Sequence, residues 1–562
     1  MGRAQREVER KFERTGAGDP VPPALTDVRG ITATAPGGHH LLDAVYWDTA
    51  DRRLAAHHIT LRRRTGGPDE GWHLKLPVPD LPDTRDEIHE PLEAGTAPSP
   101  SGGGLSPSGG GLSPSGASSS GASGGGPGAS GTAASVVVGH PPPALARLLR
   151  SRTRDAPLVP LVRLRTERHT TLLLGKNGEP RAELALDRVH AERLTPDGIP
   201  IGAHSDWTEA EVELAAGARP ALLDRLAGAL RTAGWHPSAV SSKLARALQA
   251  TDPAPPESAP ASSKSDSAPP QPPPDTAGEY VLHYLRAQRE ALISLDPAVR
   301  RDLPDAVHRM RVATRRMRSA LRSYRKLLDP ARTRPLIAEL TWLASELGVG
   351  RDQEVLTARL TAALDALPAT QRTGPVRTRL RTWSAAHRSG SRRRLRRALD
   401  GERYLRLLTT LDELTARPPL LPAATRPAAG PLTSAVSRDR RRLARRLDEA
   451  QRLPPGPDRD AGLHEARKAA KRLRYAAEAA TPALGTAARD TAAAARRLQT
   501  ALGEHQDSVM ARTALREIAD QAHAAGESSF TYGVLYAREE QHAARTEDQL
   551  PSLPPDLPRP PR

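Results

Sequence analysis

The sequence predicts an α+β protein with two unlike domains, an antiparallel β domain followed by an all-α domain. Three observations lead to this prediction. Residues 1–250 hold short segments in which apolar and polar residues alternate, which is typical of β-strands. Residues 279–547 hold long Ala-, Leu- and Arg-rich segments at helical spacing, with almost no strand signal. The Pro-rich stretch 251–277 lies between them and predicts a semi-extended linker.

Two further segments are expected to lie outside the folded domains. Residues 96–135 are almost wholly Gly, Ser, Ala and Pro and duplicate the stretch SPSGGGL, so they cannot bury a core. Because strand-like segments flank them, we interpret them as a disordered insertion within the first domain. Residues 548–562 are Pro-rich and predict a disordered tail.

The composition narrows the classes of partner. Over 562 residues the formal net charge is +17, which favours a polyanion such as nucleic acid, an anionic membrane or a phosphate polymer. The chain has only 2 Phe and 8 Tyr, without the aromatic cluster that stacks single-stranded bases, so we expect no specific nucleic-acid binding. With no Cys, disulfides, thiolate metal sites and Cys nucleophiles are excluded. The start MGRAQREVERKFE has no apolar core and no run of 18 apolar residues occurs, so we expect a cytoplasmic protein without a membrane partner.

Carboxylates share a face with a lysine on the first expected strand. In REVERKFE, strand alternation places Glu7, Glu9 and Lys11 on one face. The segment TEAEVELA repeats the pattern with three glutamates. These are Glu209, Glu211 and Glu213. Adjacent carboxylates repel unless a cation offsets them, and oxygen ligands favour Mg²⁺, Mn²⁺ or Ca²⁺ over zinc.

Basic residues alternate in the same way on other strand-like segments. They are Arg62, Arg64, Lys75, Arg163, Arg165 and Arg168. If the strands close into a barrel, acidic and basic side chains converge on an interior that is too polar for a core. A phosphate chain held by Arg and Lys, and bridged to the carboxylates by a metal, would satisfy both sets. The alternative is the ordinary exposed face of a one-sided antiparallel sheet.

The segment HRMRVATRRMRSALRSYRKLL, residues 308–328, predicts an amphipathic helix. At about 100° per residue its basic side chains fall within an arc of about 80°, opposite an apolar side. The basic arc comprises His308, Arg311, Arg315, Arg318 and Arg322. A solvated basic face is the alternative to a binding surface.

This helix has a counterpart 156 residues further along the chain. The matched residues are His308, Arg311, Arg315 and Arg318 with His464, Arg467, Lys471 and Arg474, respectively. After each helix the likeness recurs, as LGVGRDQEV at 347–355 and LGEHQDSVM at 502–510. The repeat predicts two pseudo-symmetric helical bundles whose basic faces line one shared groove. The two histidines either contact phosphate or support helix packing.

A series of short motifs runs through the first domain. The pattern Glu-x-Glu-x-Lys occupies residues 7–11, and VYWDT, LRRR, GWHLKLP, RDEIHEPL, EVEL and SSKLARAL follow. In these motifs the domain resembles the CYTH domain of the triphosphate tunnel metalloenzyme family. The resemblance implies an eight-stranded antiparallel tunnel that hydrolyses the terminal phosphate of triphosphate compounds with Mg²⁺ or Mn²⁺.

By motif position, the resemblance implies two sets of site residues. The catalytic and metal-side residues are Glu7, Glu9, Lys11, Glu211 and Glu213, with Glu87 and Asp187 as further metal ligands. The phosphate-binding residues are Lys11, Arg62, Arg64, Lys75, Arg168 and Lys243. Arg85, Arg163 and Arg165 are additional candidates, and Glu183 is the alternative to Asp187 in AELALD.

The second domain, through VHRMRVATRRMRSAL and LHEARKAAKRLRYAAE, resembles the CHAD family of helical domains. That resemblance implies binding of inorganic polyphosphate by the matched basic residues of both helices. Together the two domains predict an enzyme that hydrolyses inorganic triphosphate, short polyphosphate or another triphosphate compound, associated with polyphosphate granules. The alternatives are a non-catalytic polyphosphate-binding or targeting protein with a weak or vestigial tunnel, and an adenylate cyclase.

Overall fold

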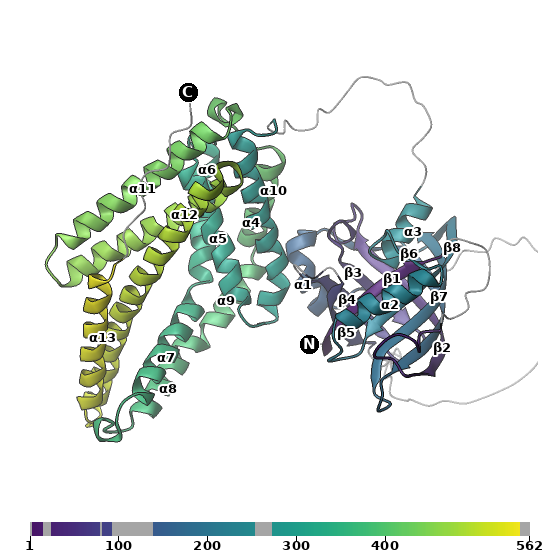
Figure 1. Ribbon diagram of the computed structural model, residues 1–562, viewed down its shortest axis with the longest axis horizontal. Helices are drawn as coiled ribbons and strands as arrows, with labels where there is room; N and C mark the ends of the chain where they lie inside the picture. The colour runs from purple at the N-terminus through teal and green to yellow at the C-terminus, as the bar shows by residue number, and fades with distance from the viewer. Residues whose placement is uncertain are drawn as a thin grey trace, which may run out of the picture. The chain divides into compact units, whose positions relative to one another are not determined.

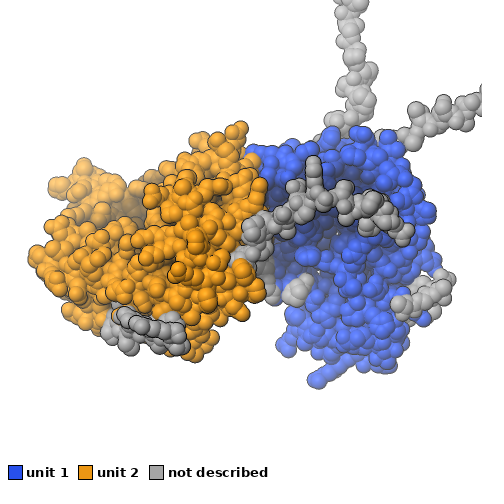
Figure 2. Space-filling model, turned by 90° about the horizontal axis from the view of Figure 1, so that it is seen from above, with its two compact units in different colours: residues 1–261 blue, residues 262–562 orange. Residues whose placement is uncertain are grey.

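The computed structural model describes residues 3–14, 24–78, 81, 83–92, 139–252 and 273–550. The chain divides into two compact units, residues 1–261 and 262–562 (Figure 2). The expected insertion at 96–135 lies outside the described residues, as do residues 253–272 of the expected linker and residues 551–562 of the expected tail.

Unit 1 is built around one antiparallel sheet (Figure 1). Its strands are β1 (Arg3–Glu13), β2 (Ala33–Thr49), β3 (Thr60–Thr65), β4 (Gly71–Pro77), β5 (Thr84–Pro91), β6 (Leu158–Leu174), β7 (Pro180–Leu194), β8 (Pro200–Leu214) and the short β9 (His236–Pro237). The order is β5-β4-β3-β2-β6-β7-β8-β1-β9, and β1 also pairs with β5. The eight long strands therefore close into a ring, which confirms the predicted eight-stranded antiparallel tunnel.

The outward side chains of the ring pack under helices. Phe12 of β1 and Val212 of β8 are fully buried in a cluster with α2 (Ala221–Thr232). In a second cluster Trp47 packs with residues of α1 (Pro143–Thr153). The short helix η1 (Ala55–His57) lies between Leu54 and Ile59, two other members of this cluster. Trp207 packs with α3 (Lys243–Thr251), which brings Lys243 to the ring. Since Phe12 and Val212 face these cores, strand alternation turns the neighbouring glutamates into the ring.

Unit 2 is helical throughout its described elements, which confirms the predicted all-α domain. The helices are α4 (Ala277–Arg300), α5 (Ala306–Ser323), α6 (Pro330–Glu346), α7 (Val349–Asp365), α8 (Val376–Ser389), α9 (Ser391–Asp400), α10 (Glu402–Ala416), α11 (Ala429–Gln451), α12 (Pro457–Ala524) and α13 (Phe530–Asp548), with the short 3-10 helices η2 (Ala369–Gln371) and η3 (Pro422–Thr425). Gly485, at φ 62° and ψ −135°, divides α12 into two helices across a kink. Among the residues that the structure describes, we find no helix with the length and apolar character needed to cross a lipid bilayer.

Helix α5 is amphipathic, as the spacing predicts. Met310, Met317 and Leu321 lie on its buried side, in the main core of unit 2. The Tyr324 hydroxyl, just beyond the helix, donates a hydrogen bond of 2.6 Å to the carbonyl of Ala476 in α12. This contact and the shared core hold α5 against the first half of α12.

The two halves of unit 2 repeat one packing detail. Gly348 and Gly503 are the glycines of the repeated Leu-Gly dipeptide. A Cβ on Gly348 would lie 3.4 Å from Nη2 of Arg311, and a Cβ on Gly503 would lie 3.4 Å from Nη2 of Arg467. Each arginine packs against the glycine of its own half, which supports the predicted pseudo-symmetry.

Candidate functional site

The interior of the ring holds a narrow cavity of about 100 Å³ lined almost wholly by charged side chains. The residues from the sequence analysis that line it are Glu7, Glu9, Lys11, Arg62, Arg64, Lys75, Arg85, Glu87, Arg168, Glu211, Glu213 and Lys243. Asp187 is fully buried beside it, in contact with Arg168 and Lys243. The structure therefore brings together side chains from seven strands and the start of α3.

One side of the cavity is a closed network of ion pairs around Lys243. Its Nζ lies 2.9 Å from Oδ2 of Asp187, 2.6 Å from Oε1 of Glu209 and 2.6 Å from Oε1 of Glu211. Arg168 donates to both oxygens of Asp187, at 2.7 and 2.6 Å, and Lys11 pairs with Glu211. Burial opposes ionisation of Asp187, but Lys243 and Arg168 outweigh it and lower the pKa of Asp187. The negative charges of these carboxylates are therefore already balanced by Lys243, Arg168 and Lys11.

The opposite side holds four carboxylates around Lys75, namely Glu7, Glu9, Glu87 and Glu213. Lys75 forms ion pairs with two carboxylates, with its Nζ 2.6 Å from Oε2 of Glu7 and 3.3 Å from Oε2 of Glu9. Burial, together with the neighbouring Glu87, raises the pKa of Glu7 to about 8. Burial also raises the pKa of Glu213, despite the nearby Lys75. Burial also opposes ionisation of Glu9 and Glu87, but Lys75 and other neighbours outweigh it and lower the pKa of both groups. Two of the four carboxyl groups therefore keep a proton more readily than an ordinary glutamate does.

This crowded side fits a divalent metal. Glu7, Glu9, Glu87 and Glu213 supply carboxylate oxygens alone, which is the donor set that Mg²⁺ and Mn²⁺ prefer. Asp187, Glu209 and Glu211 also place oxygens within 4.8 Å of one another. Lys243 contacts all three of them, however, so a cation there would have to displace an ammonium group.

Two arginines of β3 have unused hydrogen-bond donors in the cavity. Within the described part of the chain, the buried Nε groups of Arg62 and Arg64 have no hydrogen-bond partner. Burial, together with the neighbouring Arg62, lowers the pKa of Arg64 to about 10. A buried N–H group without a hydrogen-bond partner costs free energy that a bound anion would recover. The Nε groups of Arg62 and Arg64 are therefore available to an anion in the same cavity as the carboxylates.

Lys11 adds an ammonium group whose pKa lies close to neutral pH. Burial, together with the nearby Lys243, lowers the pKa of Lys11 to about 8. An anion in the cavity would favour the charged form of Lys11.

Two of the additional candidates lie outside the cavity. Nε of Arg163 lies 2.9 Å from Oδ1 of Asp43, and Nη2 of Arg165 lies 3.4 Å from Oε2 of Glu192. Both arginines stand at odd positions of β6, whereas Arg168 stands at an even position and points inward. Neither Arg163 nor Arg165 lines the ring cavity, so the structure does not support these two candidates as phosphate ligands there.

Other lining residues were missed by the motif positions. They are Tyr46, Thr60, Asp69, Ser241 and Ser242, with Glu209 close by in the Lys243 network. Strand alternation had placed Glu209 on the same face as Glu211, but the motif positions left it out of the predicted site. Asp69 pairs with Arg64 from a loop, where no periodic signal is available.

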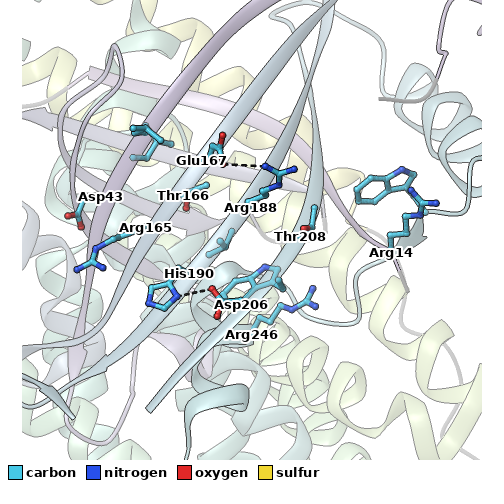
Figure 3. Close-up of a pocket in the computed structure, with 15 residues that line it drawn as sticks. Arg14, Asp43, Arg165, Thr166, Glu167, Arg188, His190, Asp206, Thr208 and Arg246 are labelled. Atoms are coloured by element: carbon cyan, nitrogen blue, oxygen red, sulfur yellow. Dashed lines mark hydrogen bonds and ion pairs between the residues drawn. The ribbon is translucent and has the colours of Figure 1, made fainter. Parts of the chain in front are cut away.

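The larger cavity of unit 1, about 880 Å³, lies elsewhere along the sheet (Figure 3). Among the phosphate-site candidates only Arg165 lines it. Its surroundings include paired charges, such as Glu167 with Arg188 and His190 with Asp206. Size alone therefore does not identify the phosphate site.

In unit 2 the two predicted basic faces converge. Burial, followed by the charges of Arg467, Arg315 and Arg311, lowers the pKa of Lys471 to about 7. The Nε groups of Arg315 and Arg467 are buried without hydrogen-bond partners among the described residues. Cations from α5 and α12 therefore face one another across a shared site, where they outnumber the nearby carboxylates of Asp352 and Asp507.

The other matched residues of unit 2 have partners of their own. Arg311 pairs with Asp352 at 3.0 Å, Arg318 approaches Thr341 at 3.4 Å, and Arg474 pairs with Glu478 at 2.7 Å. Nδ1 of His464 lies 2.5 Å from Oε1 of Gln506, and burial lowers the pKa of His464. His308 is exposed and lines a separate cavity of about 670 Å³.

Comparison with known proteins agrees with this architecture. Residues 5–233 match the CYTH domain family and residues 283–516 match the CHAD domain family. An uncharacterized protein of Mycobacterium tuberculosis, found in two strains, is 36% identical over 556 residues, which is 97% of this chain and 94% of its own. The chain belongs to the CYTH–CHAD fusion proteins. The CYTH family includes triphosphatases and cyclases and is metal-dependent.

Two solved structures resemble parts of this CYTH–CHAD protein. PptA from Streptomyces chartreusis is 22% identical and covers 49% of this chain and 97% of its own, with a TM-score of 0.42. The CHAD domain from the plant Ricinus communis is 27% identical and covers 51% of this chain and 98% of its own, with a TM-score of 0.39.

Proposed function

We propose that the CYTH unit hydrolyses inorganic triphosphate, short polyphosphate or another triphosphate compound with Mg²⁺ or Mn²⁺, and that the CHAD unit binds longer polyphosphate. One observation carries the proposal. Among the described residues, a single narrow cavity contains two buried arginine Nε–H groups without hydrogen-bond partners and, with them, the carboxyl groups of Glu7 and Glu213, whose pKa values are raised. A phosphate chain with a divalent cation would satisfy both sets.

The carboxylates of the cavity have two different roles in this proposal, metal binding and the positioning of cations. Glu7, Glu9, Glu87 and Glu213 would hold the metal, which supplies Lewis acidity and lowers the pKa of a water molecule. Asp187 and Glu211, the remaining metal-ligand predictions, orient Lys243 and Arg168 through ion pairs. These are positioning roles, because each carboxylate is already neutralised.

The cations of the cavity hold the phosphate oxygens. Arg62 and Arg64 present unused N–H groups, and Lys11 gains its full charge when an anion binds beside it. Neutralising the phosphates that do not react lets the terminal phosphorus accept a water molecule, and fixed donors cost little reorganisation. A nearby carboxylate orients that water and accepts its proton.

The CHAD unit supports the binding half of the proposal. Arg315, Arg467 and Lys471 form a cationic site with unused donors, drawn from both halves of the repeat. One flexible polyanion could touch both halves at once, which duplex DNA is too stiff to do at such short range. Binding of this polymer would place the protein at polyphosphate granules in the cytoplasm.

Phosphate release from tripolyphosphate, pyrophosphate, ATP and long polyphosphate, each with Mg²⁺ and with Mn²⁺, tests the proposal. Metal-dependent release from tripolyphosphate supports it. Cyclic AMP formed from ATP would instead identify an adenylate cyclase. Polyphosphate binding without turnover of any substrate would identify a non-catalytic binding protein.

A further inference from the structure

The sheet of unit 1 carries a histidine cluster that the proposed function does not use. His39 of β2 lies directly opposite His169 of β6 in the antiparallel register. Their rings stack with centroids 4.4 Å apart and an interplanar angle of 19°. Glu167 stands two positions before His169, so its side chain emerges on the same face of the sheet.

The three side chains converge on one point. Nε2 of His39 lies 3.2 Å from Oε1 of Glu167, and Nε2 of His169 lies 3.4 Å from the same oxygen. In tetrahedral zinc sites the ligand atoms lie about 2.0–2.1 Å from the metal, which sets them about 3.3–3.4 Å apart. Both nitrogen-to-oxygen distances in this cluster are close to that spacing, and all three ligand atoms lie within 4.8 Å of one another.

The backbone holds this arrangement on paired strands. A bulge between Pro36 and Gly38 shifts the register immediately before His39. The bulge requires a glycine, because a Cβ on Gly37 would lie 2.4 Å from Oγ1 of Thr170. Bulges re-aim the side chains that follow them, and here the following residue is His39.

The environment keeps one carboxylate oxygen available. Arg188 approaches the other oxygen of Glu167, with Nη1 3.5 Å from Oε2 (Figure 3). Oε1 is the oxygen that both imidazoles contact. The side chains of His39, Glu167 and His169 are 51%, 35% and 56% exposed, so an ion can reach them from solvent.

A second histidine cluster, in unit 2, differs in its charge balance. His505 contacts Asp460 and Glu547 at 3.3 and 2.9 Å. Arg512 pairs with Asp460 at 2.9 Å and Arg459 pairs with Glu547 at 3.0 Å. Both carboxylates there have arginine partners, and His505 is buried, so that cluster is explained as a packing network.

We propose that His39, Glu167 and His169 form a surface site for a divalent transition metal of the zinc class. Two imidazoles and one carboxylate leave the fourth position to water, as in zinc sites that exchange ligands. Imidazole nitrogen favours Zn²⁺ over Mg²⁺ and Mn²⁺, so this site and the all-carboxylate tunnel select different metals. A bound ion would also join β2 to β6.

Calorimetric titration of the full chain, without an affinity tag, with ZnCl₂ in excess Mg²⁺ tests this proposal. We expect His39→Ala and His169→Ala each to weaken zinc binding at least about tenfold, since even outer-shell changes at metal sites cost that much. His190→Ala is the matched control. His190 lies on the same sheet and contacts Asp206 through Nδ1 at 2.8 Å and Glu192 through Nε2 at 3.7 Å, and it belongs to no converging group of three ligands among the described residues. This variant should leave zinc affinity unchanged.

Thermal unfolding provides a second readout. Zinc should raise the Tm of the wild type, because a ligand that binds only the folded state stabilises it, and should not raise the Tm of His39→Ala. Zinc affinity that is unaffected by His169→Ala, or weakened equally by His190→Ala, would overturn the proposal.

Discussion

We predict that polyphosphate binding weakens as the pH rises above 7, because of the lowered pKa of Lys471. The pKa of its ammonium group is about 7 in the free protein, because the group is buried among Arg467, Arg315 and Arg311. A bound polyanion favours the charged form and returns this pKa toward the ordinary value of 10.5. Binding above pH 7 must therefore take up one proton.

The magnitude follows from linkage. One proton taken up per binding event changes the affinity about tenfold per pH unit, or about 1.36 kcal/mol. From pH 8 to pH 9 we expect the Kd of the full chain for long polyphosphate to rise about tenfold. The titration must be run at constant ionic strength, because salt weakens polyanion binding independently of pH.

Lys471→Arg provides the control for this prediction. A guanidinium group keeps its charge throughout this pH range, so the variant should bind polyphosphate with little pH dependence. The assignment of Lys471 to the binding site would be refuted if the Kd of Lys471→Arg changed with pH as steeply as expected for the wild type. It would also be refuted if the Kd of the wild type did not change with pH.

Three further predictions concern both units. Because Glu7 has a pKa of about 8, Mg²⁺ binding at pH 7 should release a proton. The Mg²⁺ affinity should therefore rise about tenfold per pH unit up to pH 8. Calorimetry in buffers of different ionisation enthalpy measures the number of protons released. Glu211→Gln should lower tripolyphosphate turnover at least about a hundredfold, since it unbalances the network of Lys243 and Lys11; wild-type turnover would contradict this. Arg315→Glu and Lys471→Glu should each weaken polyphosphate binding, with coupling in the double mutant if one polymer spans both faces; independent effects would indicate separate surfaces.

Strand alternation and the internal repeat predicted much of the site. The period of two in REVERKFE placed Glu7, Glu9 and Lys11 in the ring, because Val8 and Phe12 had to face a core. The repeat with a spacing of 156 residues predicted that Arg315 and Lys471 would meet. Both predictions depend on local periodicity, which the sequence displays directly.

Other features depend on how distant elements pack. The contact of Lys243 with three carboxylates requires α3 to dock against β7 and β8, and no local pattern encodes that position. Local alternation could have separated the candidates Arg163 and Arg165 from Arg168, since odd and even positions of a regular strand face opposite sides. The histidine cluster was missed because His39 and His169 lie 130 residues apart and meet only through the register of β2 with β6.

Metal-dependent phosphate release from tripolyphosphate by the wild type, Glu9→Gln and Glu167→Gln tests the central claim most directly. Glu9 lines the ring cavity, whereas Glu167 lies in the histidine cluster and serves as the matched control. We predict release by the wild type only with Mg²⁺ or Mn²⁺, a loss of at least about a hundredfold in Glu9→Gln, and an unchanged rate in Glu167→Gln. Release without a divalent metal, or wild-type rates in Glu9→Gln, would contradict the assignment of the ring cavity as the active site.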